Sequence, residues 1–245
     1  LAPISNISVS EEAVEQNEYD AVVTATFDLG DRTVTRDFRT YDSYSSGWSV
    51  SDGLLRISVT NFKGLGLTVN GVEPGDEYAA VFPGAYRFEL GVDEFEVGGG
   101  EDVHVLATDD DTSALYEVGP VLTEQATQTF RDLVRASLEE CLAMNTLSTP
   151  CGMDISQQFS DGSMAVDGTV KRTLSAEGEA ALNSLKPEPS YDQPTVVSSS
   201  DYIQVDIESD FTKDGATGHG SVLMGGSLNT PKVDFANEKP EVVWE

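Results

Sequence analysis

Apolar and polar residues alternate along most of the first 120 residues. In the segment 54–61, Leu55, Ile57 and Val59 fall on one side of an extended chain and polar residues fall on the other. This period of two is that of a half-buried β-strand. Similar short strands are expected at residues 22–27, 32–38, 65–71, 86–97 and 103–107.

Turn sequences separate these expected strands. Asn70-Gly71 is the strongest short hairpin signal. Pro83-Gly84 suits a turn, because proline fixes one φ and glycine tolerates a positive φ. Short strands with no helical stretch between them predict an antiparallel β-sandwich-like domain over residues 1–118.

The period changes near residue 120. Apolar residues then recur every three or four positions, at Leu122, Ala126, Phe130, Leu133, Val134, Leu138, Cys141 and Leu142. This pattern predicts an amphipathic helix of about six turns. Thr123 is a plausible start, and Asn145 and Pro150 end it. The change of period places a domain boundary within residues 112–121, so that residues 119–245 form a second domain.

The second domain is expected to combine this helix with an antiparallel sheet. Ile203, Val205, Ile207 and Phe211 fall on one face of a strand. The second domain is also expected to contain a hairpin through residues 212–218 and later strands at 232–235 and 242–244. A proline-rich loop or extended segment is expected at 186–194. We expect an α+β domain in which the helix covers the face of Ile203, Val205 and Ile207.

The charge of the chain excludes several partners. The net charge is −29, and both halves share it: residues 1–120 carry 23 acids and 6 bases, and the remainder carries 20 acids and 8 bases. Nucleic-acid binding needs a basic surface, so no nucleic-acid partner is expected. Anionic lipid surfaces are disfavoured for the same reason. The charge fits either a highly soluble surface or a protein that captures a cation or a basic partner.

Membrane attachment is expected only through a segment outside this sequence. No run of 18 or more apolar residues occurs, and no signal peptide is visible. The chain opens with Leu1-Ala2-Pro3 instead of Met, which is typical of a mature or trimmed portion.

The only two cysteines, Cys141 and Cys151, stand ten positions apart at the expected end of the helix. A zinc site needs about four ligands, and His104 and His219 are far away in different expected domains. A redox pair favours the C-x-x-C spacing at a helix N-terminus. We therefore expect a structural disulfide, with two free buried thiols as the alternative. A disulfide persists in an oxidising compartment, which predicts an exported protein.

Two segments carry a resemblance to a known group of proteins. The stretch LTVNGVEPGDEYAAVFPGAYRFEL (67–90) resembles the core of PEGA-like and TcaA-like β-domains in Gram-positive envelope proteins. The stretch LEECLAMNTLSTPCGMDIS (138–156) resembles a helix–disulfide segment of uncharacterised actinobacterial membrane-anchored proteins. The resemblance implies an extracellular, β-rich, non-enzymatic portion that is preceded by one transmembrane helix. It supplies no catalytic residues.

No common catalytic motif occurs in the chain, so we expect no enzyme and no cofactor. His219 and Ser221 would share one face of a strand, but a nucleophile also needs an oriented base and an oxyanion hole. A secreted hydrolase would require His219 or His104 beside a serine or a carboxylate in a cleft. A surface histidine in a hairpin is the competing interpretation.

Two further groups of residues are candidate sites. Asp109, Asp110 and Asp111 could bind calcium weakly, although their spacing lacks the alternation of a calcium loop; a solvated loop is the alternative. Tyr41, Tyr44 and Trp48 lie among serines and aspartates and could stack on a sugar or bind a protein. The alternative is that Trp48 fills a core.

These observations predict a non-catalytic extracellular or cell-surface domain of an envelope protein. It would serve as an interaction or spacer module whose partner is another envelope protein or a glycan. The alternative function is a small-ligand or glycan binding protein with a pocket between the second domain's helix and sheet. A filled core at that place would favour the interaction module.

Overall fold

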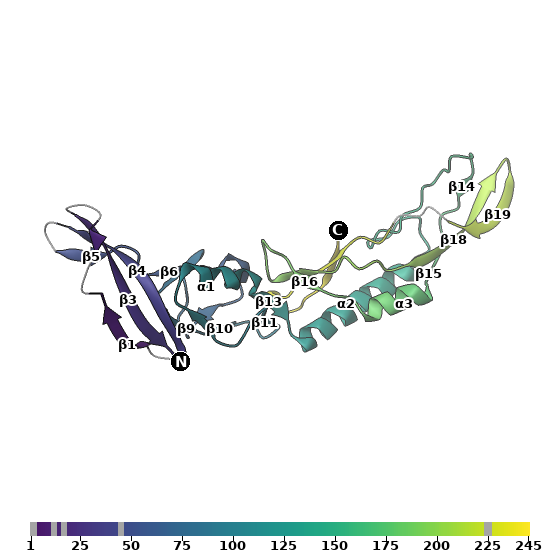
Figure 1. The fold of residues 1–245 in the computed structure, drawn as a ribbon. Helices are drawn as coiled ribbons and strands as arrows, with labels where there is room; N and C mark the ends of the chain where they lie inside the picture. The colour runs from purple at the N-terminus through teal and green to yellow at the C-terminus, as the bar shows by residue number, and fades with distance from the viewer. Residues whose placement is uncertain (1–3, 11–13, 16–18, 44–46, 223–226) are drawn as a thin grey trace. The chain divides into compact units, whose positions relative to one another are not determined.

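The computed structural model describes residues 4–10, 14–15, 19–43, 47–222 and 227–245. Its contacts divide the chain into two compact units, Leu1–Val121 (unit 1) and Leu122–Glu245 (unit 2). The division falls close to the boundary expected between residues 118 and 119. All the strand pairs with a described register are antiparallel, and the helices are few, as Figure 1 shows. The expected mainly β fold with an α+β second part is therefore confirmed.

Unit 1 begins with a five-stranded sheet. Its strands are β1 (Ile4–Val9), β2 (Val14–Glu15), β3 (Asp20–Leu29), β4 (Arg32–Asp42) and β5 (Trp48–Val50). Their order is β1-β3-β4-β5, and β2 also pairs with β3. The β3–β4 ladder runs without interruption from the Asp20–Tyr41 pair to the Leu29–Arg32 pair. Gly30, with φ of 63°, allows the tight turn that joins these two strands.

The rest of unit 1 contains four short two-stranded ladders and a short helix, α1 (Asp109–Ser113). The pairs are β6 (Leu55–Ser58) with β8 (Tyr78–Val81), β7 (Thr68–Val69) with β10 (Phe88–Glu89), β9 (Gly84–Tyr86) with β12 (His104–Leu106), and β11 (Phe95–Gly98) with β13 (Gly119–Leu122). They surround an apolar core that includes Leu55, Ile57 and Val59. The alternation seen in the sequence is thus confirmed by burial of these three side chains.

Unit 2 opens with the expected long helix, α2 (Glu124–Leu142). The Thr123 hydroxyl caps it by accepting from the Ala126 N–H at 3.2 Å. Five residues of the expected stripe are buried in α2, namely Ala126, Phe130, Val134, Leu138 and Cys141, whereas Leu133 and Leu142 are half-buried. The helix prediction is therefore confirmed.

The surroundings of α2 differ from the expectation. The helix lies against β15 (Lys171–Leu174), β21 (Val242–Trp244) and a second helix, α3 (Ala176–Asn183). The Trp244 indole N–H donates to the Ser137 hydroxyl at 2.9 Å, which attaches β21 to the helix. The strand that carries Val205 and Ile207, β18 (Val205–Lys213), pairs with β15.

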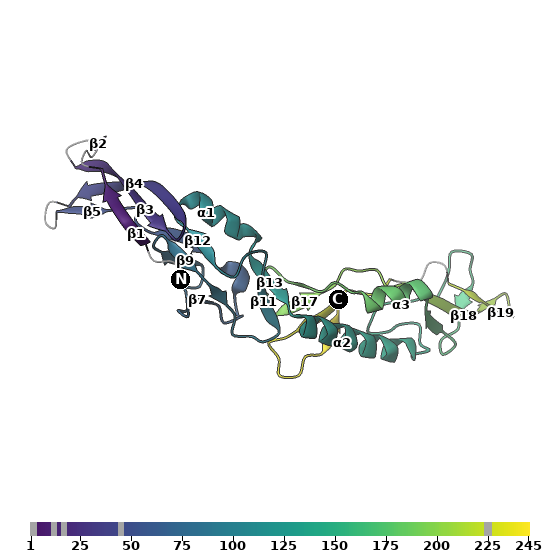
Figure 2. The ribbon, with the colours of Figure 1, turned by 60° about the horizontal axis from the view of Figure 1, so that its bottom comes forward.

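Unit 2 contains two four-stranded antiparallel sheets where the sequence indicated one. The first has the order β14 (Met164–Ala165), β18, β15, with β19 (Ala216–Ser221) also paired with β18. The second has the order β16 (Glu188–Pro189), β17 (Val196–Ser198), β20 (Pro231–Asp234), β21. Figure 2 shows the β18–β19 hairpin reaching beyond the two helices.

Candidate binding surface

The five-stranded sheet of unit 1 has one polar and one apolar face. Residues directly opposite in an antiparallel pair share a face. On the polar face, Thr24 donates to Asp37 at 2.6 Å and Thr33 donates to Asp28 at 2.6 Å. The other face carries Val23, Ala25, Phe27 and Leu29 of β3, opposite Phe38, Arg36, Val34 and Arg32 of β4.

A β-bulge in β1 adds more apolar side chains to this face. The pairing of β1 with β3 shifts between Ser5 and Ser8, and Asn6 has φ of 50°. The Asn6 amide then turns to the polar side and donates to Asp28 at 2.7 Å. In a regular strand Ile4 and Ile7 would point to opposite sides, because side chains alternate. The extra residue of the bulge places both of them, with Val9, on the apolar face.

The part of the apolar face near the β3–β4 turn is covered. Phe27, Leu29 and Val34 form a small core with Ala107. Arg36 lies beside this core, with its guanidinium 4.9 Å from the centre of the Phe38 ring. It donates to the Asp52 carbonyl oxygen at 2.6 Å and to the Ala107 carbonyl oxygen at 3.5 Å.

Farther from the β3–β4 turn, the apolar face forms an open apolar groove of about 480 Å³. Ile7 is 65% exposed, Val50 is 54% exposed and Phe82 is 69% exposed. The described residues that line it are Ile4, Ile7, Val9, Val23, Ala25, Phe27, Phe38, Thr40, Val50, Gly53, Phe82 and Pro83. The one hydroxyl among them, that of Thr40, already donates to the Ala21 carbonyl oxygen at 2.9 Å. The described side chains of the groove therefore present an almost entirely apolar surface.

The turn that carries Phe82 is built by the Pro83-Gly84 sequence. A side chain at Gly84 would meet the Tyr86 hydroxyl at 2.9 Å, so the Tyr86 ring lies over this glycine. The Tyr86 hydroxyl donates to the Phe82 carbonyl oxygen at 2.5 Å. Burial raises the pKa of Tyr86, so the hydroxyl stays protonated and keeps this bond. The Pro-Gly-x-Tyr element noted in the sequence thus presents Phe82 at the groove.

The aromatic residues proposed as ligand contacts are not one platform. Tyr41 pairs with Ser49 and Trp48 pairs with Asp42, so Tyr41 lies on the polar face and Trp48 on the apolar face. Both side chains are exposed. Tyr44 lies outside the described residues. Trp48 extends the apolar surface next to Val50, and no core encloses it.

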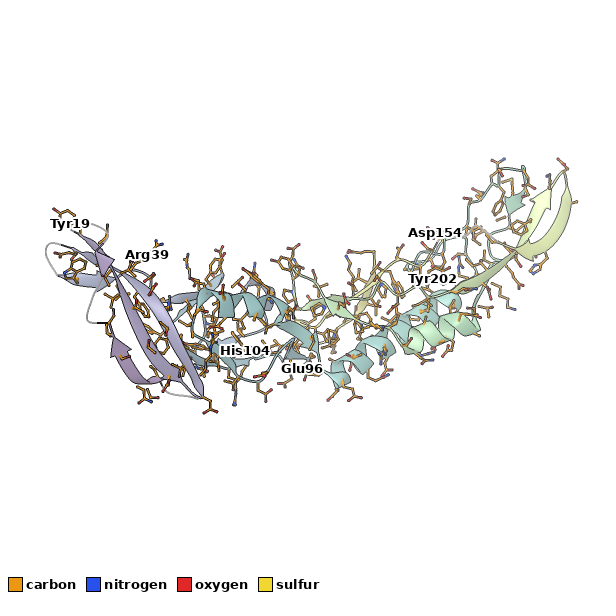
Figure 3. All side chains as sticks on the ribbon, in the orientation of Figure 1. Tyr19, Arg39, Glu96, His104, Asp154 and Tyr202 are labelled. Atoms are coloured by element: carbon orange, nitrogen blue, oxygen red, sulfur yellow. A yellow bond between two sulfur atoms is a disulfide. The ribbon has the colours of Figure 1, made fainter. Side chains whose placement is uncertain are left out.

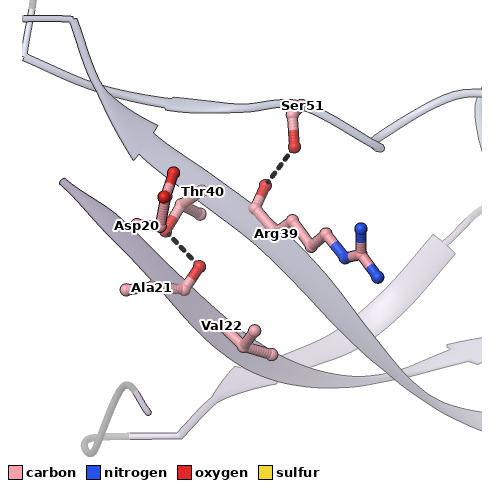
Figure 4. Close-up of a pocket in the computed structure, with 6 residues that line it drawn as sticks. All are labelled: Asp20, Ala21, Val22, Arg39, Thr40 and Ser51. Carbon is pink, nitrogen blue, oxygen red and sulfur yellow. Dashed lines mark hydrogen bonds between the residues drawn. The ribbon is translucent and has the colours of Figure 1, made fainter. Parts of the chain in front are cut away.

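A second hollow of about 530 Å³ lies along β3 and β4 (Figure 4). Asp20, Arg39 and Ser51 contribute to its lining. The Ser51 hydroxyl donates to the Arg39 carbonyl oxygen at 3.1 Å, so it joins the strands.

A third hollow, also of about 530 Å³, lies beside His104. Its lining includes Glu89, Glu96, Glu101 and Asp102, and Figure 3 labels His104 and Glu96. Burial lowers the pKa of His104, against the opposing effect of Glu101. The ring lies 5.2 Å from that of Phe88.

His219 does not face a serine. In the β18–β19 hairpin its Nδ1 lies 2.8 Å from Asp210 Oδ1, and its Nε2 lies 3.9 Å from Glu208 Oε2. Ser221 is the cross-strand partner of Glu208. Both ring nitrogens therefore point to carboxylates, which is the arrangement of an exposed hairpin histidine.

The aspartate run forms a short helix, α1 (Asp109–Ser113), in place of the expected loop. Asp111 Oδ1 accepts from Arg32 at 2.7 Å, and Oδ2 accepts from the N–H groups of Ala107 and Thr108 at 2.8 Å. Both oxygens are thus occupied by protein donors. Within the described residues, no group of three or more His, Cys, Asp or Glu side chains could hold a metal ion.

Cys141 and Cys151 lie at disulfide distance, with their Cα atoms 6.2 Å apart. Both are buried, and Cys151 is 0% exposed. The expected cysteine pair is confirmed. In the part of the chain that the structure describes, no helix is long and apolar enough to cross a membrane.

Comparisons with known proteins do not assign this chain to a family. A scan against protein-family models, a search of curated proteins and a search of solved structures each found no match. The resemblance to membrane-anchored envelope proteins therefore stays a prediction.

Proposed function

We propose that this chain is a non-catalytic interaction module that binds a partner protein through the apolar groove of unit 1. The observation that carries the proposal is the open apolar face itself. Contiguous exposed apolar surface on a soluble domain marks an interaction site, since leaving it in water is unfavourable. Here it occurs on a chain of net charge −29.

The geometry of the sheet also supports the proposal. An antiparallel sheet with one solvated face normally exposes its polar side and buries its apolar side. Here the polar side carries a hydrogen-bonded network, and part of the apolar side is left uncovered by described residues. A partner that covers Ile7, Val9 and Val50 would complete the usual arrangement.

The alternative of a ligand pocket between the helix and sheet of unit 2 has less support. Phe130, Val134 and Leu138 on the inner side of α2 are 0% exposed. Protein cores of this kind are filled at close-packed density. A stacking site for a glycan also has less support, because Tyr41 and Trp48 lie on opposite faces of the sheet.

We further propose that the module works outside the cytoplasm, as part of an extracellular or cell-surface protein. The buried Cys141–Cys151 pair supports this location, since structural disulfides persist in oxidising compartments. Attachment to a membrane would use a segment outside this chain. Mass measurement of the protein from its native source, before and after reduction, tests the location through the state of the cysteines.

A neutral apolar dye tests the groove. We expect Nile red to bind the protein with a blue-shifted emission, and the double variant Ile7→Asn/Val50→Asn to abolish most of that signal. Val72→Asn is the matched control, because Val72 is 68% exposed in the same unit but does not line the groove. Equal dye binding by all three proteins would refute the proposal.

A further inference from the structure

We infer that the occupant of the groove is one amphipathic α-helix of a partner protein, with basic residues along its flanks. This inference rests on the proposed function and names the chemistry of the partner.

The first step concerns hydrogen bonds. The described side chains that line the groove offer no free donor or acceptor, because the Thr40 hydroxyl is bonded to Ala21. An extended peptide laid there would bury its own backbone N–H and C=O groups without partners, which is costly. A helix satisfies its backbone internally and can bring apolar side chains alone.

The second step concerns size. Four neighbouring strands, β1, β3, β4 and β5, span about 14 Å at the usual strand spacing of about 4.8 Å. A helix with its side chains is about 10–12 Å wide, so one helix fits and two do not. From Val23 to Phe27 the groove floor extends about 14 Å. A helix covers that length with about nine residues, or between two and three turns.

The third step concerns the shape of the contact. Val23, Ala25 and Phe38 form the floor, while Val9 stands on one side of it and Val50 on the other. A ridge of apolar side chains at positions i, i+3, i+4 and i+7 of a helix would lie along such a floor. Phe82 would contact the helix from the β8–β9 turn.

The fourth step concerns charge. Unit 1 carries 23 acids and 6 bases, so the unit as a whole is strongly acidic. A second copy of the chain would carry the same acidic excess, so the two copies would repel each other. Basic flanks would instead be attracted over roughly a Debye length, about 8 Å at physiological salt. The charge therefore favours a basic partner over self-association.

The experiment uses three fluorescent 18-residue probe peptides. One has leucines at helical spacing with lysines elsewhere, the second replaces every lysine by glutamate, and the third has the composition of the first with leucine and lysine alternating. Binding is measured by fluorescence anisotropy at about 0.15 M salt. We expect the helical Leu/Lys peptide to bind more tightly than the other two.

The variants locate the binding. Ile7→Asn/Val50→Asn introduces no charge and should weaken binding of the helical Leu/Lys peptide at least about tenfold, because two buried apolar contacts are lost. Val72→Asn should leave the dissociation constant within about twofold. Unchanged binding by the double variant would overturn the inference, since the peptide would then be held by the acidic surface in general.

The remaining outcomes separate this inference from the proposed function. If Nile red responds to the double variant but no peptide binds, or the alternating peptide or the Leu/Glu peptide binds equally well, the groove stands and the basic helix is wrong. If neither the dye nor the peptides respond, both proposals fail. A dimer in sedimentation that the double variant dissociates would identify a second copy as the occupant and overturn the inference.

Discussion

The guanidinium of Arg172 donates to the Met153 carbonyl oxygen at 3.0 Å, inside unit 2 and only 4% exposed to solvent. It also donates to the carbonyl oxygens of Met144 at 3.1 Å and Leu147 at 3.4 Å. Burial lowers the pKa of Arg172, and the nearby Asp154 carboxylate opposes that effect. One buried side chain therefore binds the loop that follows α2 at three points.

Replacing this arginine should destabilise the protein strongly. Arg172→Met would leave three carbonyl groups with fewer partners, and we expect the free energy of unfolding to fall by about 3 kcal/mol. Arg135→Met is the control, because Arg135 forms a surface ion pair with Glu179 at 2.7 Å and should cost less than about 1 kcal/mol. Urea unfolding at pH 7 measures both. Equal losses would mean that the three hydrogen bonds of Arg172 stabilise the protein no more than an exposed ion pair does.

The disulfide should also stabilise the loop that follows α2. We expect Cys141→Ala/Cys151→Ala to lower the free energy of unfolding by about 3 kcal/mol, since the cross-link restricts the unfolded chain. Because Cys141 is 3% exposed and Cys151 is 0% exposed, reductant should reach the bond only when the protein opens. Alkylation followed by mass measurement should show slow reduction in buffer and rapid reduction in urea. Rapid reduction in buffer would contradict the described burial.

The helix and the disulfide could be predicted because their signals are local. A stripe of apolar residues at helical spacing predicted the buried residues Phe130, Val134 and Leu138, and the cysteine pair closes a short loop at its end. What packs against α2 could not be predicted in this way. The choice of β15 and β21 over β18 depends on contacts between segments far apart in the chain.

The groove was missed for a different physical reason. Strict alternation assigns Ile4 and Ile7 to opposite faces, and the bulge at Asn6 reverses that assignment for one of them. A signal was present, because an asparagine within an apolar strand tolerates positive φ. Tyr41 and Trp48 were grouped by closeness in sequence, but the register of the β4–β5 hairpin separates them.

Asp111 should make stability depend on pH in a defined window. Burial alone would raise its pKa, but hydrogen bonds from Arg32, Ala107 and Thr108 outweigh burial and hold the pKa below the usual value. An unfolded aspartate titrates near 3.9. The stabilisation is therefore complete above about pH 5 and is lost as the pH falls below about 4, through the folded pKa.

Asp111→Asn tests this dependence. We expect a loss of about 1–2 kcal/mol at pH 7 that shrinks as the pH falls below about 4 and the wild-type carboxyl takes up its proton. Asp110→Asn, which changes an exposed neighbour, should stay within about 0.5 kcal/mol throughout. Thermal unfolding at several pH values gives the comparison. A loss that is independent of pH would rule out the charged hydrogen bonds as its cause.

The groove residues should matter for binding and little for stability. Phe82→Ser changes a side chain that is already exposed, so the free energy of unfolding should change by no more than about 0.5 kcal/mol. Phe27→Ala, which changes a buried side chain of the groove floor that also belongs to the small core, should cost about 3–5 kcal/mol. Urea titration separates the two effects. A large loss for Phe82→Ser would mean that this residue belongs to the core of unit 1.

The glycine run at Gly98–Gly100 should tolerate no side chain at its centre. Gly99 has φ of 81°, and a Cβ there would lie far inside the contact distance of the Glu117 carbonyl oxygen. Gly71 has a similar φ of 75° with nothing within 4 Å of a Cβ, so it isolates the cost of the backbone conformation. We expect Gly71→Ala to cost about 1–2 kcal/mol. Gly99→Ala should cost about 1–3 kcal/mol more, because β11 must move away from residues 117–121. Urea unfolding of both variants measures the difference, and equal costs would show that the close approach to Glu117 is relieved without strain.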